Sequence, residues 1–195
     1  MASFLRQTFS TLFLTFVFVI IFAINPSYGD YDDPEEMPLR GTELAMLICN
    51  HTWYNKFCVD KLTPAGPDAR ASDITNSALR LAQTAADNTG VVITNLLEDP
   101  SSSMKQQERR ILQKCQLDNN VTSTNILAAG NDLNSDSINS MIEDINTAGN
   151  ATKSCQDIIK KTRFSASLSD KNMDVIRLCE ICVVSTQFYT FEDFY

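Results

Sequence analysis

The spacing of apolar residues constrains the fold most, because it follows the helical period through four long segments. Residues that commonly start and stop helices bound these segments: Asp73 to Pro100, Met104 to Ala129 with a stop at Gly130, Ser135 or Asp136 to Gly149, and Ser169 onwards. In each segment we expect a buried face of apolar or small residues: Ile74, Ala78, Leu81, Ala85, Val92 and Leu96; Leu112, Cys115, Thr122 and Ile126; Ile138, Met141, Ile142, Ile145 and Ala148; Val175, Leu178, Cys179, Cys182 and Val183. No segment sustains the period of two that strands show. The pattern predicts an all-α, up-and-down four-helix bundle with an N-terminal helical hairpin extension.

The first 29 residues have the layout of a secretory signal peptide. Arg6 precedes an apolar run from Leu12 to Ile24, and small residues stand at the −3 and −1 positions of a cleavage site between Gly29 and Asp30. The run is shorter than the roughly 20 residues that a membrane-spanning helix needs. We therefore expect cleavage, secretion to the outside of the cell with the vacuole as an alternative destination, and no membrane association of the mature chain.

The mature chain is acidic. Residues 30–42 are rich in acids and prolines and predict a disordered leader, and residues 43–195 predict one domain. Loss of Arg6 with the signal peptide changes the net charge from −8 to −9. Such a charge argues against nucleic acid and anionic lipid as partners, since both require basic residues. It favours either a basic partner or simply solubility.

All six cysteines follow the signal peptide, where an oxidising compartment permits disulfides. They allow 15 pairings, so their number alone fixes none. Three Asn-x-Thr sequons, at Asn50, Asn120 and Asn150, agree with a secretory route and are candidate N-glycosylation sites.

Residues for catalysis or metal binding are scarce. His51 is the single histidine, and neither a Gly-x-Ser-x-Gly elbow nor a glycine-rich phosphate loop is present. Cys179 and Cys182 have zinc-ligand spacing, but they lie in an apolar helical stretch without a second close pair. Acidic pairs such as Glu143-Asp144 fit a solvated surface better than a glycosidase cleft. We predict no catalytic residue, metal or cofactor, and a protein that is not an enzyme.

The cysteines stand in four stretches of distinctive sequence. Residues 48–58 place Cys49, Thr52, Tyr54 and Cys58 on the pattern I-C-x-x-T-x-Y-P-x-x-C, followed by Leu112-Gln113-Lys114-Cys115, Ser154-Cys155-Gln156-Asp157 and Asn172-x2-Val175-x2-Leu178. Through these stretches, which are spread over nearly the whole mature length, the chain resembles the plant invertase/pectin methylesterase inhibitor family. It departs from that family at Asn55 in place of proline, at Asn119 in place of a frequent aromatic residue, and at residues 146–149 in place of a small apolar stretch.

The resemblance implies two disulfides, Cys49–Cys58 and Cys115–Cys155. Chain-entropy arguments give the first about 2–3 kcal/mol and the second about 4 kcal/mol of stabilisation. Cys179 and Cys182 remain, either as buried reduced thiols or as donors to an intermolecular bridge.

The resemblance also implies that the chain acts by binding an enzyme. Pectin methylesterase inhibitors cover the pectin cleft in a one-to-one complex, using polar residues of the bundle helices. Invertase inhibitors present a P-K-F segment before the last helix. At the similar place Arg163 and Phe164 are candidate target contacts, the first for acidic groups and the second for a sugar subsite. We predict a pectin methylesterase inhibitor, with invertase inhibition as the alternative and a carrier of an apolar ligand as a third reading. The oligomeric state stays open.

Overall fold

The computed structural model describes residues 39–62, 66–99, 104–190 and 193. The predicted signal peptide, the cleavage site between Gly29 and Asp30, and residues 30–38 of the predicted leader lie outside these residues. The first helix begins at Gly41, two residues before the predicted domain boundary. In the described part of the chain no helix is both long and apolar enough to cross a membrane.

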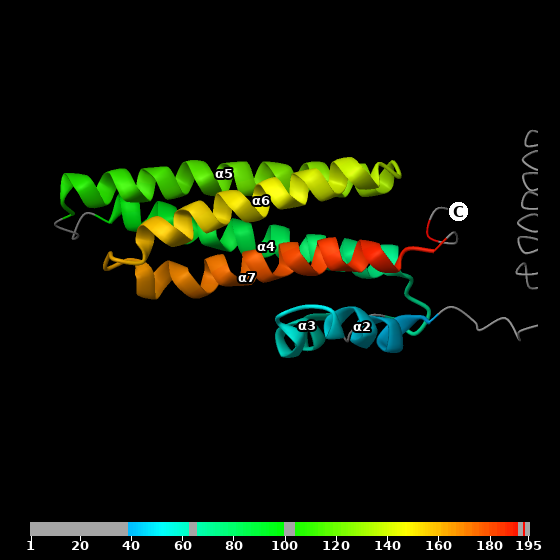
Figure 1. The fold of residues 1–195 in the computed structure, drawn as a ribbon. Coiled ribbons are helices and arrows are strands. Elements are labelled where there is room, and N and C mark those ends of the chain that lie inside the picture. The colour runs from blue at the N-terminus through cyan, green and yellow to red at the C-terminus, as the bar shows by residue number, and fades with distance from the viewer. Residues whose placement is uncertain (1–38, 63–65, 100–103, 191–192, 194–195) are drawn as a thin grey trace, which may run out of the picture. The chain divides into compact units, whose positions relative to one another are not determined.

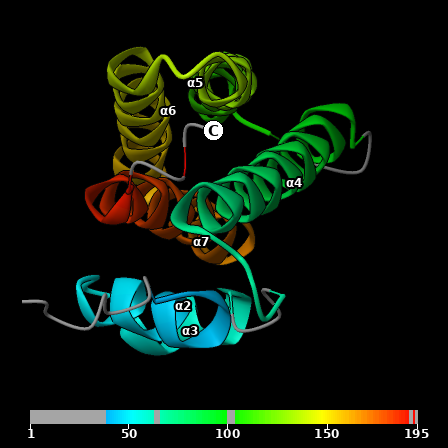
Figure 2. The same ribbon diagram turned by 90° about the vertical axis from the view of Figure 1, so that its right-hand side faces the viewer.

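The described residues form six α-helices, a short 3-10 helix and no strand, as predicted for the fold class (Figure 1). The elements are α2 (Gly41–Asn50), α3 (Asn55–Leu62), α4 (Ala71–Glu98), α5 (Gln106–Asn134), α6 (Ile138–Ile159), α7 (Ser165–Ser185) and η1 (Thr186–Phe188). Helices α4 to α7 run alternately up and down as a bundle. The hairpin of α2 and α3 packs beside α4 and α7, away from α5 and α6 (Figure 2).

Two hydrophobic clusters fill the bundle. The larger cluster joins the hairpin to all four bundle helices through fully buried side chains that include Ile48, Ile74 and Ile145. The smaller one fills the end where α5 and α7 begin, and its members are Ile93, Leu112, Cys115, Cys155, Ile159, Phe164 and Leu168. The centre of the bundle is thus packed with side chains, which gives the carrier interpretation no support.

The buried face of α4 is rotated relative to the predicted one. Ile74 and Ala78 are buried, whereas the other predicted members, Leu81, Ala85, Val92 and Leu96, are only partly buried. Their places at the centre are taken by smaller or polar residues, namely Thr75, Ala82, Ala86 and Thr89, together with Ile93. Asp73 lies in the first turn rather than at the N-cap, and its Oδ2 accepts a hydrogen bond of 3.0 Å from the backbone N–H of Arg70.

The predicted glycine stops at Gly130 and Gly149 are wrong. Helix α5 continues to Asn134 and α6 to Ile159, so both glycines are internal, and α7 begins four residues before Ser169. An internal glycine costs about 1 kcal/mol relative to alanine, which tertiary packing readily outweighs. A Cβ at Gly149 would lie 3.6 Å from Cys179 Cβ, so this glycine marks a close contact between α6 and α7.

Helices α4 and α5 approach closely at Gly90. A Cβ added there would lie 2.8 Å from Nδ2 of Asn119, closer than atoms pack. Asn119 stands where the resemblance led us to expect an aromatic side chain. The small residue on α4 therefore leaves room for the amide on α5.

Four of the six cysteines are paired as the resemblance implies. Cys49–Cys58 closes the hairpin and Cys115–Cys155 joins α5 to α6, with Cα–Cα distances of 5.4 Å and 4.8 Å. Cys179 and Cys182 are buried free thiols of α7. Burial raises the pKa of Cys179 to about 12, so both the location and the protonation of this thiol oppose an intermolecular bridge.

Candidate docking surfaces

The turn between α6 and α7 presents Arg163 but not Phe164. Arg163 Nε lies 3.3 Å from Oε1 of Glu108 on α5, and its guanidinium lies 5.1 Å from the centre of the Phe164 ring. The Arg163 side chain is about half exposed, at 47%. It is therefore accessible to an acidic partner, as the sequence led us to expect.

Phe164 is a core residue, contrary to the role we expected for it. Only 4% of the residue is exposed, and it packs in the smaller cluster with Ile93 and Leu168. The turn is held by Thr162, whose hydroxyl donates to the Ile159 carbonyl at 2.8 Å and accepts from the Phe164 N–H at 3.2 Å. In this conformation the ring cannot enter a sugar subsite.

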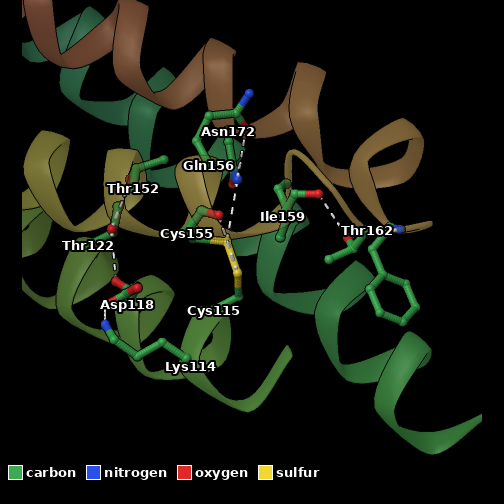
Figure 3. The surroundings of a disulfide bond; sticks show 11 residues. Lys114, Cys115, Asp118, Thr122, Thr152, Cys155, Gln156, Ile159, Thr162 and Asn172 are labelled. Carbon is green, nitrogen blue, oxygen red and sulfur yellow. Dashed lines mark hydrogen bonds and ion pairs between the residues drawn. A yellow bond between two sulfur atoms is a disulfide. The ribbon is translucent and has the colours of Figure 1, made fainter. Parts of the chain in front are cut away.

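A buried polar network surrounds the second disulfide (Figure 3). Asn172 Nδ2 of α7 donates to Cys155 Sγ at 3.4 Å and to Gln156 Oε1 at 3.3 Å. The hydroxyls of Thr122 and Thr152 form a hydrogen bond with each other, and the buried carboxylate of Asp118 forms an ion pair with Lys114. Covalent and polar links together fix α5 against α6 and hold the outer side of α5 as a rigid surface.

The outer side of α5 carries three exposed apolar side chains, a feature that the sequence pattern did not single out. Leu117, Val121 and Leu127 are 63%, 43% and 64% exposed, and we call them the α5 face. They lie off the buried face of Leu112, Cys115, Thr122 and Ile126. Exposed apolar side chains on a rigid surface are candidates for contact with another protein.

The tip of the hairpin carries the most exposed aromatic residue of the described chain. Trp53 is 92% exposed, although its backbone N–H donates to Glu180 Oε1 of α7 at 3.0 Å. Next to it, the Arg177 guanidinium lies over the rings of Tyr54 and Phe57, at 5.0 and 5.2 Å. The backbone of the tip is thus held in place, while the Trp53 indole is exposed to solvent. Its sequence signal is the tryptophan between the matched residues Thr52 and Tyr54.

The three sequon asparagines, Asn50, Asn120 and Asn150, are exposed. The threonines that complete these sequons, Thr52, Thr122 and Thr152, are all buried. Each asparagine is therefore accessible to carry a glycan, but each threonine already has a packing role in the folded protein.

The structure also places the single histidine and the candidate metal ligands. His51 is exposed, its Nδ1 lies 2.9 Å from the Leu47 carbonyl oxygen, and its ring meets the edge of Phe188 at 5.1 Å. Within the described residues no group of three or more His, Cys, Asp or Glu side chains could hold a metal ion.

The chain is similar in sequence and in fold to known proteins. The model of the family described as plant invertase/pectin methylesterase inhibitor matches residues 44–184. A mutant form of a pectin methylesterase inhibitor from Arabidopsis has a similar fold, with a TM-score of 0.66, 18% identity, and coverage of 74% of this chain and 95% of that one. A pectin methylesterase inhibitor from Arabidopsis thaliana gives a TM-score of 0.59, 18% identity, and coverage of 76% and 97%. A search of curated proteins finds no match.

The two structural similarities establish the helical fold, and the sequence match extends from α2 to the last turn of α7. That range includes both disulfides and all four bundle helices. The chain therefore belongs to the plant invertase/pectin methylesterase inhibitor family.

Proposed function

We propose that the mature chain is a secreted inhibitor of pectin methylesterase that acts in the cell wall space. It forms a one-to-one complex in which a bundle surface covers the pectin-binding cleft of the enzyme. The observation that carries this proposal is the α5 face, three exposed apolar side chains on the outer half of a helix that is cross-linked to its neighbour.

Rigidity is what makes this surface suitable for inhibition. Burying an exposed leucine contributes about 1.5–3 kcal/mol, but ordering a flexible segment on binding would offset part of that gain. The Cys115–Cys155 disulfide and the Thr122–Thr152 hydrogen bond order the α5–α6 pair before any partner arrives. The gain from Leu117 and Leu127 is then available for binding.

Charge supports an esterase of basic character as the target. The mature chain has a net charge of −9, which is −8 for the full chain less Arg6. Opposite net charges speed the encounter of two proteins and make it sensitive to salt. Inhibition of such an esterase should weaken as ionic strength rises.

Invertase inhibition remains the second candidate, and the exposure of Arg163 is the observation that favours it. A guanidinium can pair with the acidic groups of a glycosidase site, and invertase would also allow a vacuolar location. Because Phe164 is buried, the turn offers one contact rather than two, and we place the esterase first.

The test mixes the purified mature chain with pectin methylesterase and with invertase at mildly acidic and at neutral pH. We expect loss of esterase activity at micromolar inhibitor. Leu117→Ser with Leu127→Ser should abolish it, whereas Val91→Ser, which changes an exposed apolar residue of α4, should not. Asn120→Gln is assayed in parallel, since a glycan there would lie beside Leu117 and Val121. Undiminished esterase activity would refute the proposal, and loss of invertase activity alone would favour the second candidate.

A further inference from the structure

One end of this acidic protein is basic. The first turns of α5 and the turn between α6 and α7, residues 105–110 and 157–163, contain six basic residues and two acidic ones, a net charge of +4. The basic residues are Lys105, Arg109, Arg110, Lys160, Lys161 and Arg163, and we call them the basic end. Glu98 and Asp99 at the end of α4 reduce the local charge to +2, still opposite in sign to the whole chain.

The two basic segments are adjacent and fixed. The ion pair of Arg163 with Glu108, at 3.3 Å, joins them directly. The Cys115–Cys155 disulfide and the buried Phe164 ring brace the helices just behind them. In Figure 1 the start of α5 and the connection from α6 to α7 lie at the same end of the bundle.

Several of these cations have no acidic partner. Lys160 pairs with Asp157 and Arg163 with Glu108. Lys105, Arg109, Arg110 and Lys161 are exposed, and within the described ranges none of them forms an ion pair. Four charges are therefore available for an anionic ligand.

The acidic part of the protein is too distant to cancel this field. Residues 128–147, at the opposite end, contain four acidic residues and no basic one. Helix α5 has 29 residues and is therefore about 43 Å long, against a Debye length of about 8 Å at physiological salt. Two helices start and two end at the basic end, so their dipoles offset each other and the side chains determine the local potential.

We propose that the basic end binds the carboxylates of a polyuronate, the polymer left when the methyl esters of pectin are hydrolysed. This inference rests on the proposed function, because hydrolysis by the target esterase releases methanol and leaves one carboxylate for each ester. A linear polyanion offers carboxylates at successive positions, which suits cations contributed by two separate segments. Arginine binds such groups in bidentate fashion. The inhibitor would thus be retained on polymer that its target enzyme has already processed.

The test measures binding of the secreted mature chain to immobilised polygalacturonate without methyl esters, at about 50 mM salt. Lys105→Gln/Arg109→Gln/Lys161→Gln should lower the affinity about tenfold or more, since each charge contact contributes to the salt-dependent binding of a polyanion. The control Lys56→Gln/Arg80→Gln/Lys153→Gln changes the net charge equally but alters exposed cations elsewhere, and it should retain the affinity. Fully methylesterified pectin, which is uncharged, should not bind.

Two results would overturn the inference: no binding to polygalacturonate, or equal losses of affinity in the two triple variants. Methanol release from highly methylesterified pectin separates this inference from the proposed function. A chain that inhibits the esterase but ignores polygalacturonate overturns only the inference. A chain that binds the polymer without inhibiting overturns only the proposed function.

Discussion

The hydroxyl oxygens of Thr122 and Thr152 lie 2.9 Å apart in the core between α5 and α6. Thr122 Oγ1 also lies 2.9 Å from the Asp118 carbonyl oxygen, and Thr152 Oγ1 lies 3.1 Å from that of Ala148. Both threonines complete sequons, so the residues that would direct glycosylation are also structural residues.

This pairing sets when Asn120 and Asn150 can be modified. An oligosaccharyltransferase must reach the sequon threonine, which is buried after folding. We expect the enzyme to modify the reduced, unfolded chain at these sites and to leave the folded protein unmodified. Mass spectrometry of the two reactions checks this, and efficient modification of the folded protein would contradict it.

Loss of the second disulfide should cost much of the stability. Cys115→Ser with Cys155→Ser opens a loop of 41 residues and should lower the free energy of unfolding by about 4 kcal/mol. That corresponds to about 8–16 °C in melting temperature for a domain of this size. Cys49→Ser with Cys58→Ser, measured by the same calorimetry, should cost less, about 2–3 kcal/mol. An unchanged melting temperature in the first variant would contradict the cross-link.

Changing Phe164 to alanine should lower the free energy of unfolding much more than changing Arg163 to alanine. Phe164→Ala empties a buried site and should cost about 3–5 kcal/mol. Arg163→Ala removes a partly exposed ion pair and should cost less than about 1 kcal/mol. Urea denaturation measures both, and equal small effects would show that the Phe164 ring does not anchor the turn.

Trp53 offers a direct report on docking at the hairpin tip, since it is the single tryptophan of the chain. Because its side chain is bare, Trp53→Phe should change the free energy of unfolding by no more than about 0.5 kcal/mol. If the tip contacts a target enzyme, the fluorescence emission of Trp53 should shift when a tryptophan-free fragment of that enzyme binds. With the intact enzyme, the fluorine NMR signal of a fluorine-labelled Trp53 should shift instead. An unchanged signal in a stable complex would exclude the tip from the interface.

Stability should respond to pH through Asp144. Partial burial, followed by the neighbouring carboxylates of Asp132 and Glu143, raises the pKa of Asp144 above 3.8. The protonated form is favoured in the folded state, so this contribution is complete below about pH 3.8 and is lost as the pH rises through the raised pKa. Asp144→Asn should therefore raise the melting temperature at neutral pH by on the order of 1 °C, and not at all below pH 3.8. Asp60→Asn, at an exposed site outside the cluster, is the control, and equal effects at both pH values would contradict the account.

The sequence predicted the helical bundle and its hairpin well because long amphipathic segments leave few alternatives. Helix ends were predicted less well, since Gly130 and Gly149 are common stop signals that tertiary packing overrode. On α4 the period was right but the phase was shifted, because small residues such as Ala82 and Ala86 occupy the centre where helices meet closely. The sequence of one helix does not determine how closely a neighbouring helix packs against it.

The docking features were harder to predict than the fold. Arg163 was accessible as expected, but burial of Phe164 depends on Ile93 and Leu168, which are distant in sequence. Leu117, Val121 and Leu127 attract no notice in a helix with many apolar residues until the opposite side is known to be the buried one. The joining of two basic segments likewise required the bundle topology, which places Glu108 beside Arg163.

Packing of α7 also makes two of the six thiols inaccessible to disulfide formation. While the chain is extended, six thiols are open to oxidants and fifteen pairings compete. Once Cys179 and Cys182 are buried, four sulfurs remain within reach and the competing pairings fall to three. If α7 packs before the disulfides form, mispaired disulfides that involve Cys179 or Cys182 are prevented. If it packs afterwards, these two thiols can still form incorrect disulfides.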